Sequence, residues 1–185
     1  MVTIGYQGVE GSNSEEAARQ LAEKHEFRNY SLMPLVSSFN VLDNVIKKRI
    51  DYGVVAVSNN KGGIVEESKI VLDHLNITRF DEITLPITHF LFVKNDKIKL
   101  KDIREIASHP QAFKQCKSTL KQSFSHCDLK KDEDTATAAR KLSLGILPNT
   151  TAVLCRKNAG FMNGLFLFES NLEDKSDNKT TFEMY

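Results

Sequence analysis

Apolar residues recur along the chain with two spacings, one typical of strands and one typical of helices. Short apolar or alternating runs bounded by Gly, Pro, Asn or Asp predict strands. Apolar positions three and four residues apart predict helices between those runs. Strands are predicted over residues 2–6, 30–33, 52–57, 81–93, 103–107, 151–155 and 165–168, and helices over residues 12–22, 38–46, 64–75, 110–124, 134–145 and 158–163.

This alternation of strands and helices predicts an α/β fold with mixed, largely parallel sheets. The composition changes near Pro86, and apolar alternation resumes after residue 165. Two crossings of the chain would give one lobe from residues 1–80 plus 166–185 and a second from residues 81–165. We expect a cleft between such lobes, with ligands near the carboxyl ends of the strands.

Three predicted helix starts offer backbone N–H groups and the positive end of a helix dipole. Ser12 stands three residues before Glu15, the spacing of a capping box. Pro110 suits the first turn of a helix. A single start of this kind is ordinary capping, but three of them favour an anionic ligand. The three starts are residues 12–14, 108–110 and 134–135.

Composition narrows the function classes further. The 185 residues are 41% hydrophobic and 26% charged, with a net charge of +1, so no strong field favours nucleic acid or an anionic membrane. No signal-peptide pattern is visible, and no apolar run approaches the ~20 residues of a membrane span. The three scattered cysteines indicate a reduced, cytoplasmic protein.

Metal and cofactor motifs are not expected. His25, His74 and His126 have no ligand spacing with one another or with the cysteines. Cys116 has no visible paired base, so we expect a buried thiol. The glycines near residues 8 and 62 match neither a P-loop nor a dinucleotide fingerprint.

Six segments, in order, carry a family resemblance. The most specific is S-H-P-Q-A-F-K-Q-C at residues 108–116, which is nearly S-H-P-Q-A-L-x-Q-C. The others are G-V-E-G-S-N-S at 8–14, D-Y-G-V-V-A-V-S-N-N at 51–60, L-P-I-T-H at 85–89, T-A-T-A-A at 135–139 and N-K-T-T-F at 178–182. Together they resemble the catalytic domain of the prephenate dehydratase family over nearly the whole chain.

The resemblance implies a two-lobed fold similar to type II periplasmic binding proteins. It implies loss of carbon dioxide and water from prephenate, giving phenylpyruvate for phenylalanine biosynthesis, without a cofactor. The partner implied is a small dicarboxylate, with a homodimer as a further expectation. The family's ACT regulatory domain is not expected within these 185 residues.

The resemblance also assigns residues. Thr180 matches the family's threonine at the leaving hydroxyl, where it would donate a hydrogen bond or relay a proton. His89 is expected to be structural. The residues expected to bind substrate are Ser12, Asn13, Ser14, Asn59, Asn60, Thr135, Asn178, Thr181 and Phe182, and those expected to form a structural motif are Ser108, His109, Pro110 and Gln111.

Two departures bear on activity. Thr181 stands where the family's T-R-F motif has arginine, and a threonine cannot grip a carboxylate as an arginine fork does. Ser58 stands where the family's E-N-S has glutamate. Asn13 and Val9 replace a phenylalanine and a proline. Cations that could take the place of the arginine are Lys61, Arg156, Lys175 and Lys179.

Three functional hypotheses remain open from the sequence. The chain could be a prephenate dehydratase that tolerates Thr181. It could be a related enzyme with another outcome, such as decarboxylation without aromatisation. It could also be a binding module that has lost turnover.

Overall fold

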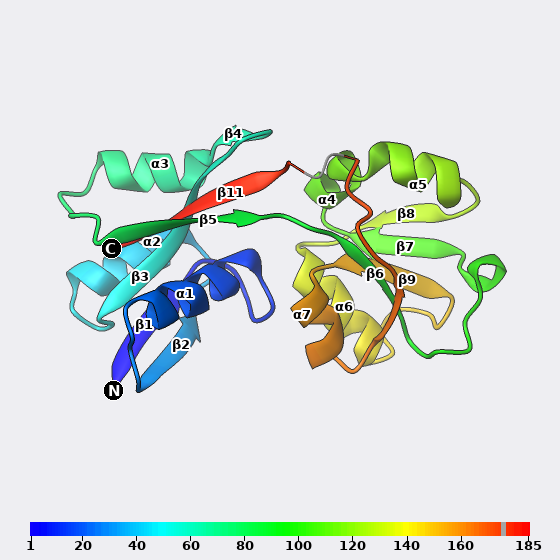
Figure 1. The fold of residues 1–185 in the computed structure, drawn as a ribbon, viewed down its shortest axis with the longest axis horizontal. Coiled ribbons are helices and arrows are strands. Elements are labelled where there is room, and N and C mark those ends of the chain that lie inside the picture. Colours follow the sequence, from blue (N-terminus) through cyan, green and yellow to red (C-terminus); the bar gives the residue numbers. More distant parts are fainter. Residues whose placement is uncertain (175–176) are drawn as a thin grey trace. The chain divides into compact units, whose positions relative to one another are not determined.

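The computed structural model describes residues 1–174 and 177–185 and divides the chain into two compact units. The first unit is Met1–Ile87 with Asp177–Tyr185, and the second is Thr88–Ser176. Each unit is built around its own mixed sheet (Figure 1). The chain is therefore an α/β protein of two sheets, as the sequence predicts.

The first unit has nine elements. Its sheet has the order β2-β1-β3-β11-β5, with β4 paired to β3. Strands β1, β2 and β3 are parallel, whereas β11 runs antiparallel to both β3 and β5. The elements are β1 (Val2–Tyr6), α1 (Asn13–Lys24), β2 (Tyr30–Pro34), α2 (Ser38–Ile46), β3 (Tyr52–Asn59), β4 (Gly63–Ile64), α3 (Glu66–Asp73), β5 (Asp81–Pro86) and β11 (Lys179–Met184).

Helices cover both faces of this first sheet. Ala17, Ala18 and Leu21 of α1 pack with Phe182 and Leu85 on one face. A second cluster forms on the other face, where α2 and α3 pack against Val55 and Tyr185 (Figure 1). Alternate residues of each strand therefore supply two separate cores, which is why these strands are apolar along most of their length.

The second unit has the sheet order β10-β6-β9-β7-β8. Strands β7, β8 and β9 are parallel, and β6 is antiparallel to both β9 and β10. The elements are β6 (Phe90–Val93), a 3-10 turn (Leu100–Asp102), β7 (Glu105–Ser108), α4 (Pro110–Gln115), α5 (Lys117–Ser123), β8 (Asp128–Lys131), α6 (Thr135–Ser143), β9 (Thr151–Cys155), α7 (Lys157–Met162) and β10 (Phe166–Glu169).

The unit boundaries differ from those expected at residues 80/81 and 165/166. Strand β5 pairs with β11 in the first sheet, and β10 pairs with β6 in the second. The predicted strand over residues 81–93 is therefore two strands in two sheets. Pro86, which lacks a backbone N–H, is the last residue of β5.

Two further elements differ from the prediction. The helix expected over residues 110–124 is divided at Cys116, whose φ of −114° and ψ of 17° end α4. Strand β8 was not predicted, because its four residues are all exposed and do not alternate in polarity. Its place is set by parallel pairing with β7 instead.

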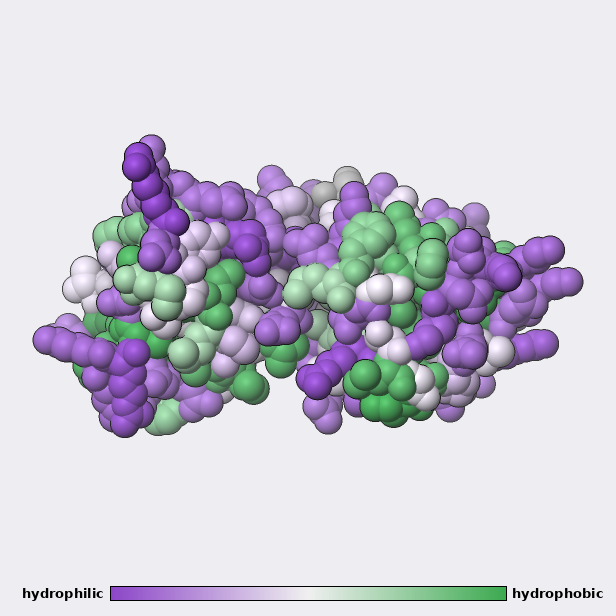
Figure 2. Space-filling model, turned by 90° about the horizontal axis from the view of Figure 1, so that it is seen from below, coloured by the Kyte–Doolittle hydropathy of each residue, from purple (hydrophilic) through white to green (hydrophobic). Residues whose placement is uncertain are grey.

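The face of the molecule seen in Figure 2 carries polar side chains with groups of apolar ones between them. Among the described residues, no helix has both the length and the apolar character needed to cross a membrane. All three cysteines are free thiols, and Cys116 is buried as expected.

Candidate functional site

Strand directions gather the predicted residues of the first unit at one edge of its sheet. The carboxyl ends of β1, β3 and β5 and the amino end of β11 share this edge, because β11 runs antiparallel to β3 and β5. Asn59 and Asn60 lie at the end of β3, and Asn178 and Thr180 at the start of β11. Helix α1 begins after β1 at the same edge.

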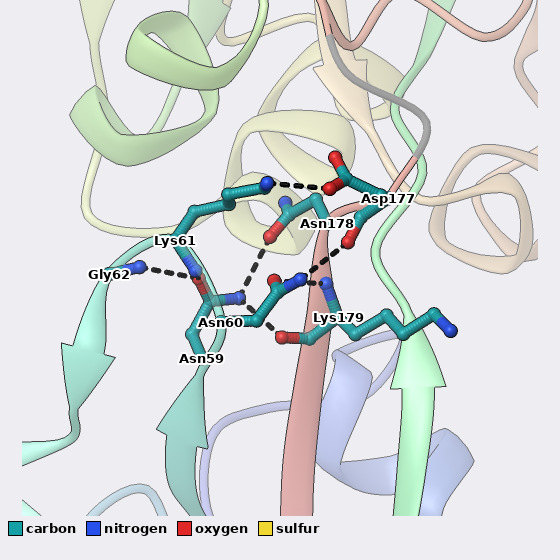
Figure 3. A network of polar contacts seen from close by, with 7 residues as sticks. All are labelled: Asn59, Asn60, Lys61, Gly62, Asp177, Asn178 and Lys179. Atoms are coloured by element: carbon teal, nitrogen blue, oxygen red, sulfur yellow. Dashed lines mark hydrogen bonds and ion pairs between the residues drawn. The ribbon is translucent and has the colours of Figure 1, made fainter.

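Asn59 is the centre of a polar network at this edge (Figure 3). Its Oδ1 accepts hydrogen bonds from the backbone N–H groups of Lys61 and Gly62, at 2.9 and 2.7 Å. An amide oxygen held by two N–H donors fixes which side of the amide is nitrogen. The Nδ2 group of Asn59 must therefore face β11.

That Nδ2 group meets three acceptors on β11 and the residue before it. It lies 2.9 Å from Oδ1 of Asn178, 3.0 Å from the carbonyl oxygen of Lys179 and 2.8 Å from Oγ1 of Thr180. The direct register pairing of Thr180 with Asn59 places both side chains on one face of the sheet. Asn59, Asn178 and Thr180 thus form one cluster from segments about 120 positions apart in sequence.

The contact with Asn59 determines which hydrogen bonds the Thr180 hydroxyl can still form. Its oxygen accepts from Asn59, and no described residue accepts from its O–H group. The hydroxyl can therefore donate to a ligand while its oxygen remains hydrogen-bonded. A donor to that oxygen also stabilises negative charge that builds up there when the proton is shared.

Asn178 is almost fully enclosed, with 3% of its surface exposed. Its Oδ1 accepts from Asn59 and its backbone oxygen accepts from the N–H of Ile87 at 2.8 Å. Its Nδ2 is buried and has no hydrogen-bond partner among the described residues. An unpaired buried donor costs free energy, so Asn178 has capacity for one further acceptor.

Asn60 and Lys61 hold the chain next to β11. Asn60 donates from Nδ2 to the carbonyl oxygen of Asp177 at 2.6 Å and accepts at Oδ1 from the N–H of Lys179 at 2.8 Å. Lys61 forms an ion pair with Asp177 at 2.6 Å (Figure 3). The side chain of Asn60, expected to bind substrate, is engaged with the backbone here.

Thr181 lies on the other face of β11 from Thr180. Successive strand residues alternate in direction, and Oγ1 of Thr181 shares a 2.9 Å hydrogen bond with Oγ1 of Thr84 on β5. On β3, its register partner is Ser58. The two departures from the family motifs, at residues 58 and 181, are therefore cross-strand neighbours.

Phe182 belongs to the core under α1 and has 1% of its surface exposed. It packs with Ile4, Leu85 and Val54. Its contacts in the first unit are those of a core residue that anchors β11 below Thr180.

The start of α1 holds the next three predicted residues. Ser12 is the N-cap, and its Oγ accepts from the N–H of Glu15 at 3.3 Å. Glu15 does not return to Ser12 as in a full capping box, but accepts from the N–H of Gly11 at 2.5 Å. Asn13 and Ser14 follow in the first turn, and Oδ1 of Asn13 is a buried acceptor without a partner among the described residues.

The other two predicted helix starts lie in the second unit and are closed by their own caps. Asp134 accepts the N–H groups of Ala136 and Thr137, both at 2.8 Å, beside Thr135. His109 caps α4 through Nδ1, which accepts from the N–H of Gln111 at 3.1 Å, and Pro110 follows as the first helical residue. The start of α1 also has its own cap, since Oγ of Ser12 accepts from the N–H of Glu15.

The remaining motif residues of the second unit have structural contacts. Ser108 is buried and donates from Oγ to the carbonyl oxygen of Leu154 at 2.5 Å. His89 is buried too, and its Nε2 lies 2.6 Å from Oε1 of Gln115. Burial lowers the pKa of His89, and burial raises the pKa of the Cys116 thiol. A protonated buried thiol is no nucleophile.

The cations considered in place of the motif arginine have different surroundings. Lys61 is bound to Asp177, and Lys179 is an exposed residue at the start of β11. Lys175 lies outside the described residues. Sequence reasoning missed Asp177 as the partner of Asn60 and Lys61, because the D-N pair before the motif threonine carries no signal of its own.

Comparisons with known proteins show the family and the fold of the chain. A family model described as prephenate dehydratase matches residues 4–184. "Arogenate dehydratase/prephenate dehydratase 2, chloroplastic" from Arabidopsis thaliana is 30% identical over 185 residues, covering 99% of this chain and 46% of the relative. The chain thus spans just under half the length of that curated relative.

Solved structures show the same fold. A prephenate dehydratase from Arthrobacter aurescens, in complex with L-Phe, aligns with a TM-score of 0.82 at 21% identity, covering 99% of this chain and 59% of that one. A nutrient binding protein from Burkholderia cenocepacia bound to methionine aligns at 0.51 with 14% identity, covering 100% and 84%. With a family match over residues 4–184, the chain belongs to the prephenate dehydratase family.

Proposed function

We propose that this chain converts prephenate to phenylpyruvate, carbon dioxide and water, in the cytoplasm and without a cofactor, as a step toward phenylalanine. Relatives described as prephenate dehydratases motivate the substrate, and the chain's own residues supply groups for the step. The observation that carries the proposal is the 2.8 Å contact from Nδ2 of Asn59 to Oγ1 of Thr180.

The reaction needs little beyond orientation and one proton donor. The bond from the ring to its carboxylate breaks and releases carbon dioxide, and that electron pair enters the ring. The ring hydroxyl leaves with a proton as water, and the ring becomes aromatic. Aromatisation provides the driving force, so the protein has to hold the substrate and assist the leaving hydroxyl.

Thr180 fits the role of donor to that hydroxyl. A threonine hydroxyl is a weak acid, so it acts through a hydrogen bond or passes a proton onward. Asn59 supports this by donating to Oγ1 of Thr180, which stabilises charge on that oxygen in the transition state. Asn59 is itself fixed by Lys61 and Gly62, so the donor geometry exists before substrate arrives.

The same edge of the sheet offers groups for the substrate's carboxylates. The start of α1 presents the backbone N–H groups of Asn13 and Ser14 at the positive end of the helix dipole. Asn178 has an Nδ2 donor without a partner among the described residues. We assign these groups to the anionic part of the substrate, in preference to Asn60, Thr181 and Phe182, whose side chains have other contacts.

The missing motif arginine does not argue against activity on this view. Residues 58 and 181 are register partners, so the glutamate and arginine of the family motifs would stand opposite each other as an ion pair. This chain has replaced both with hydroxyl side chains, Ser58 and Thr181. Replacing both residues removes a cross-strand contact that would stabilise the fold by roughly 0.2–1 kcal/mol. It leaves neither a glutamate nor an arginine without its partner.

The test is product formation from prephenate by the wild-type chain and three variants. Thr180→Ala should lower kcat about 10²–10⁴-fold, the range for loss of a general acid, whereas Thr180→Ser keeps a hydroxyl and should retain most activity. Thr84→Ala is the matched control, since it removes an exposed hydroxyl on the neighbouring strand from the other face. Absorbance and mass spectrometry identify the product.

Each other outcome selects another hypothesis. A decarboxylated, non-aromatic product would assign the altered reaction. Thermal stabilisation by prephenate without any product would assign a binding module. Equal losses in Thr180→Ala and Thr84→Ala would contradict the role given to Thr180.

A further inference from the structure

Strand β3 contains one residue more than its pairing with β11 requires. Thr181 is the register partner of Ser58, but the next residue of β11, Phe182, is the partner of Ala56. Val57 is therefore the extra residue of a β-bulge, which is a common feature beside functional sites. The bulge separates two registers of the same pair of strands.

The bulge decides which side chain lies opposite Thr180. If the register beyond the bulge continued unchanged, Thr180 would be the partner of Ser58. A shift of one residue also turns the side chains of a strand to the other face of the sheet. With the bulge, Thr180 is instead the partner of Asn59, and their side chains make the 2.8 Å hydrogen bond. The proposed donor geometry thus depends on where the bulge lies.

The side chain of Gln7 holds β3 next to the bulge. The backbone N–H of Gln7 donates to the carbonyl oxygen of Val54 at 3.0 Å and so continues the parallel ladder of β1 and β3. In such a ladder the N–H of Ala56 would next donate to the backbone oxygen of Gln7. It donates instead to Oε1 of the Gln7 side chain, at 3.1 Å, because the chain turns away at Gly8, which has a φ of 92° and pairs with Val36. The glutamine side chain thus replaces a main-chain acceptor directly before the bulge.

A carboxylate on α3 fixes the orientation of the Gln7 amide. Nε2 of Gln7 donates to Oε2 of Glu67 at 2.9 Å, and an ionised carboxylate only accepts. Oε1 of Gln7 must therefore be the atom that faces the N–H of Ala56. Oε1 of Glu67 accepts from the N–H of Ser38, the first residue of α2, at 2.7 Å. The starts of α2 and α3 and the end of β1 are in this way joined to the bulged strand.

We propose that Gln7 is a positioning residue for the reaction assigned to this site. By holding Ala56 it fixes the bulge at Val57, and the bulge places Asn59 opposite Thr180. The inference rests on the proposed function, in which Asn59 supports the Thr180 hydroxyl. Gln7 acts without touching the substrate, since its amide oxygen and nitrogen are both engaged within the protein. Loss of the amide should therefore lower kcat by misplacing Asn59, with KM little changed.

Kinetics with prephenate test this role in three variants. Gln7→Met has nearly the same length and no strong acceptor, and should lower kcat about tenfold to a hundredfold. Gln7→Glu keeps an acceptor for Ala56 but sets two carboxylates against each other, and should lower kcat as well. Adding Glu67→Gln to Gln7→Glu exchanges the two side chains and restores every bond, because the amide now at position 67 donates to the carboxylate at position 7 and still accepts from Ser38. This exchanged pair should return kcat close to the wild-type value.

Gln20→Met is the matched control. Gln20 donates from Nε2 to Oε1 of Glu16 at 2.7 Å on α1, so this variant removes the same kind of bond away from β3 and should leave kcat unchanged. Circular dichroism and the melting temperature show that each variant is folded. A fall in kcat in Gln20→Met as large as that in Gln7→Met would overturn the proposal.

Nuclear Overhauser effects between Asn59 and Thr180 report the register without any substrate. They should be present in the wild type and in the exchanged pair, and weak or absent in Gln7→Met. Full effects in Gln7→Met would overturn the proposal, as would an exchanged pair no more active than Gln7→Glu. A wild type that shows the expected effects but makes no phenylpyruvate would reject the proposed function, while loss of those effects in Gln7→Met would still support the control of the register by Gln7.

Discussion

At the residue scale, two neighbouring threonines have separate surroundings because a strand alternates its side chains. Thr180 shares a face with Asn59 and the start of α1, whereas Thr181 faces Thr84 and Ser58. A five-residue motif cannot show this division. The change from arginine at residue 181 therefore bears on how two strands pair, and not on the hydroxyl of Thr180, for which we propose the role of donor.

A double-mutant cycle at residues 58 and 181 tests the paired replacement. We expect Ser58→Glu and Thr181→Arg together to be more stable than the two single effects predict, by about 0.2–1 kcal/mol. The nearby acids Glu82 and Glu183 are already bound to Arg79, so the new arginine depends on the new glutamate. Urea denaturation measures the free energy of unfolding of the wild type, the two single variants and the double variant, and so gives the change caused by each variant.

Kinetics of the same variants separate a structural role from a substrate contact. With Thr181 facing away from Thr180, the double variant should keep kcat/KM near the wild-type value. A large rise in kcat/KM from Thr181→Arg alone, without any coupling in stability, would show that residue 181 meets the substrate.

At the element scale, long-range capping decides where helices begin. The predicted helix over residues 110–124 breaks at Cys116 because Asp174, far along the chain, accepts the N–H groups of Ser118 and Thr119 at 2.8 and 2.9 Å. These bonds start α5 as a separate helix. Nothing near residue 116 in sequence announces the break.

A second cross-element contact gives a prediction for stability against pH. Asp81, at the start of β5, binds Lys24 at 2.6 Å and His25 at 2.7 Å, at the end of α1. Hydrogen bonding from Lys24 lowers the pKa of Asp81 to about 2 from an ordinary value of 3.8. The carboxylate form is thus favoured by folding, so its contribution is complete above about pH 3.8 and is lost as the pH falls through about 2.

Comparison of wild type with Asp81→Asn measures this contribution. The wild type should be the more stable at pH 6, and the difference in the free energy of unfolding should shrink as the pH is lowered below 4. A difference that stays constant down to pH 3 and below would place the effect in packing instead of charge.

At the scale of the whole molecule, the chain builds one unit from two separate pieces and the other from one. Strand β5 pairs with β11 alone among the described strands, so the first unit depends on residues 177–185. The second unit is continuous from residue 88 to residue 176, and its main core lies within it.

Fragments test this organisation. Residues 88–176 alone should fold and unfold cooperatively, whereas residues 1–87 alone should not, because β5 would lack its partner. Joining residue 87 to residue 177 by a short Gly-Ser linker should restore the first unit, since Ile87 donates to Asn178 at 2.8 Å. Circular dichroism and thermal unfolding report each result, and a cooperatively folding 1–87 fragment would contradict the dependence on β11.

The sequence by itself determined the α/β class, most elements and the family, because hydrophobic period and local motifs are short-range signals. Tertiary structure alone decided the unit boundaries, the two-helix break at Cys116 and the unpredicted β8. It also decided that Ser58 stands opposite Thr181. Each of these depends on strand register or on a contact between distant segments, which no local pattern encodes.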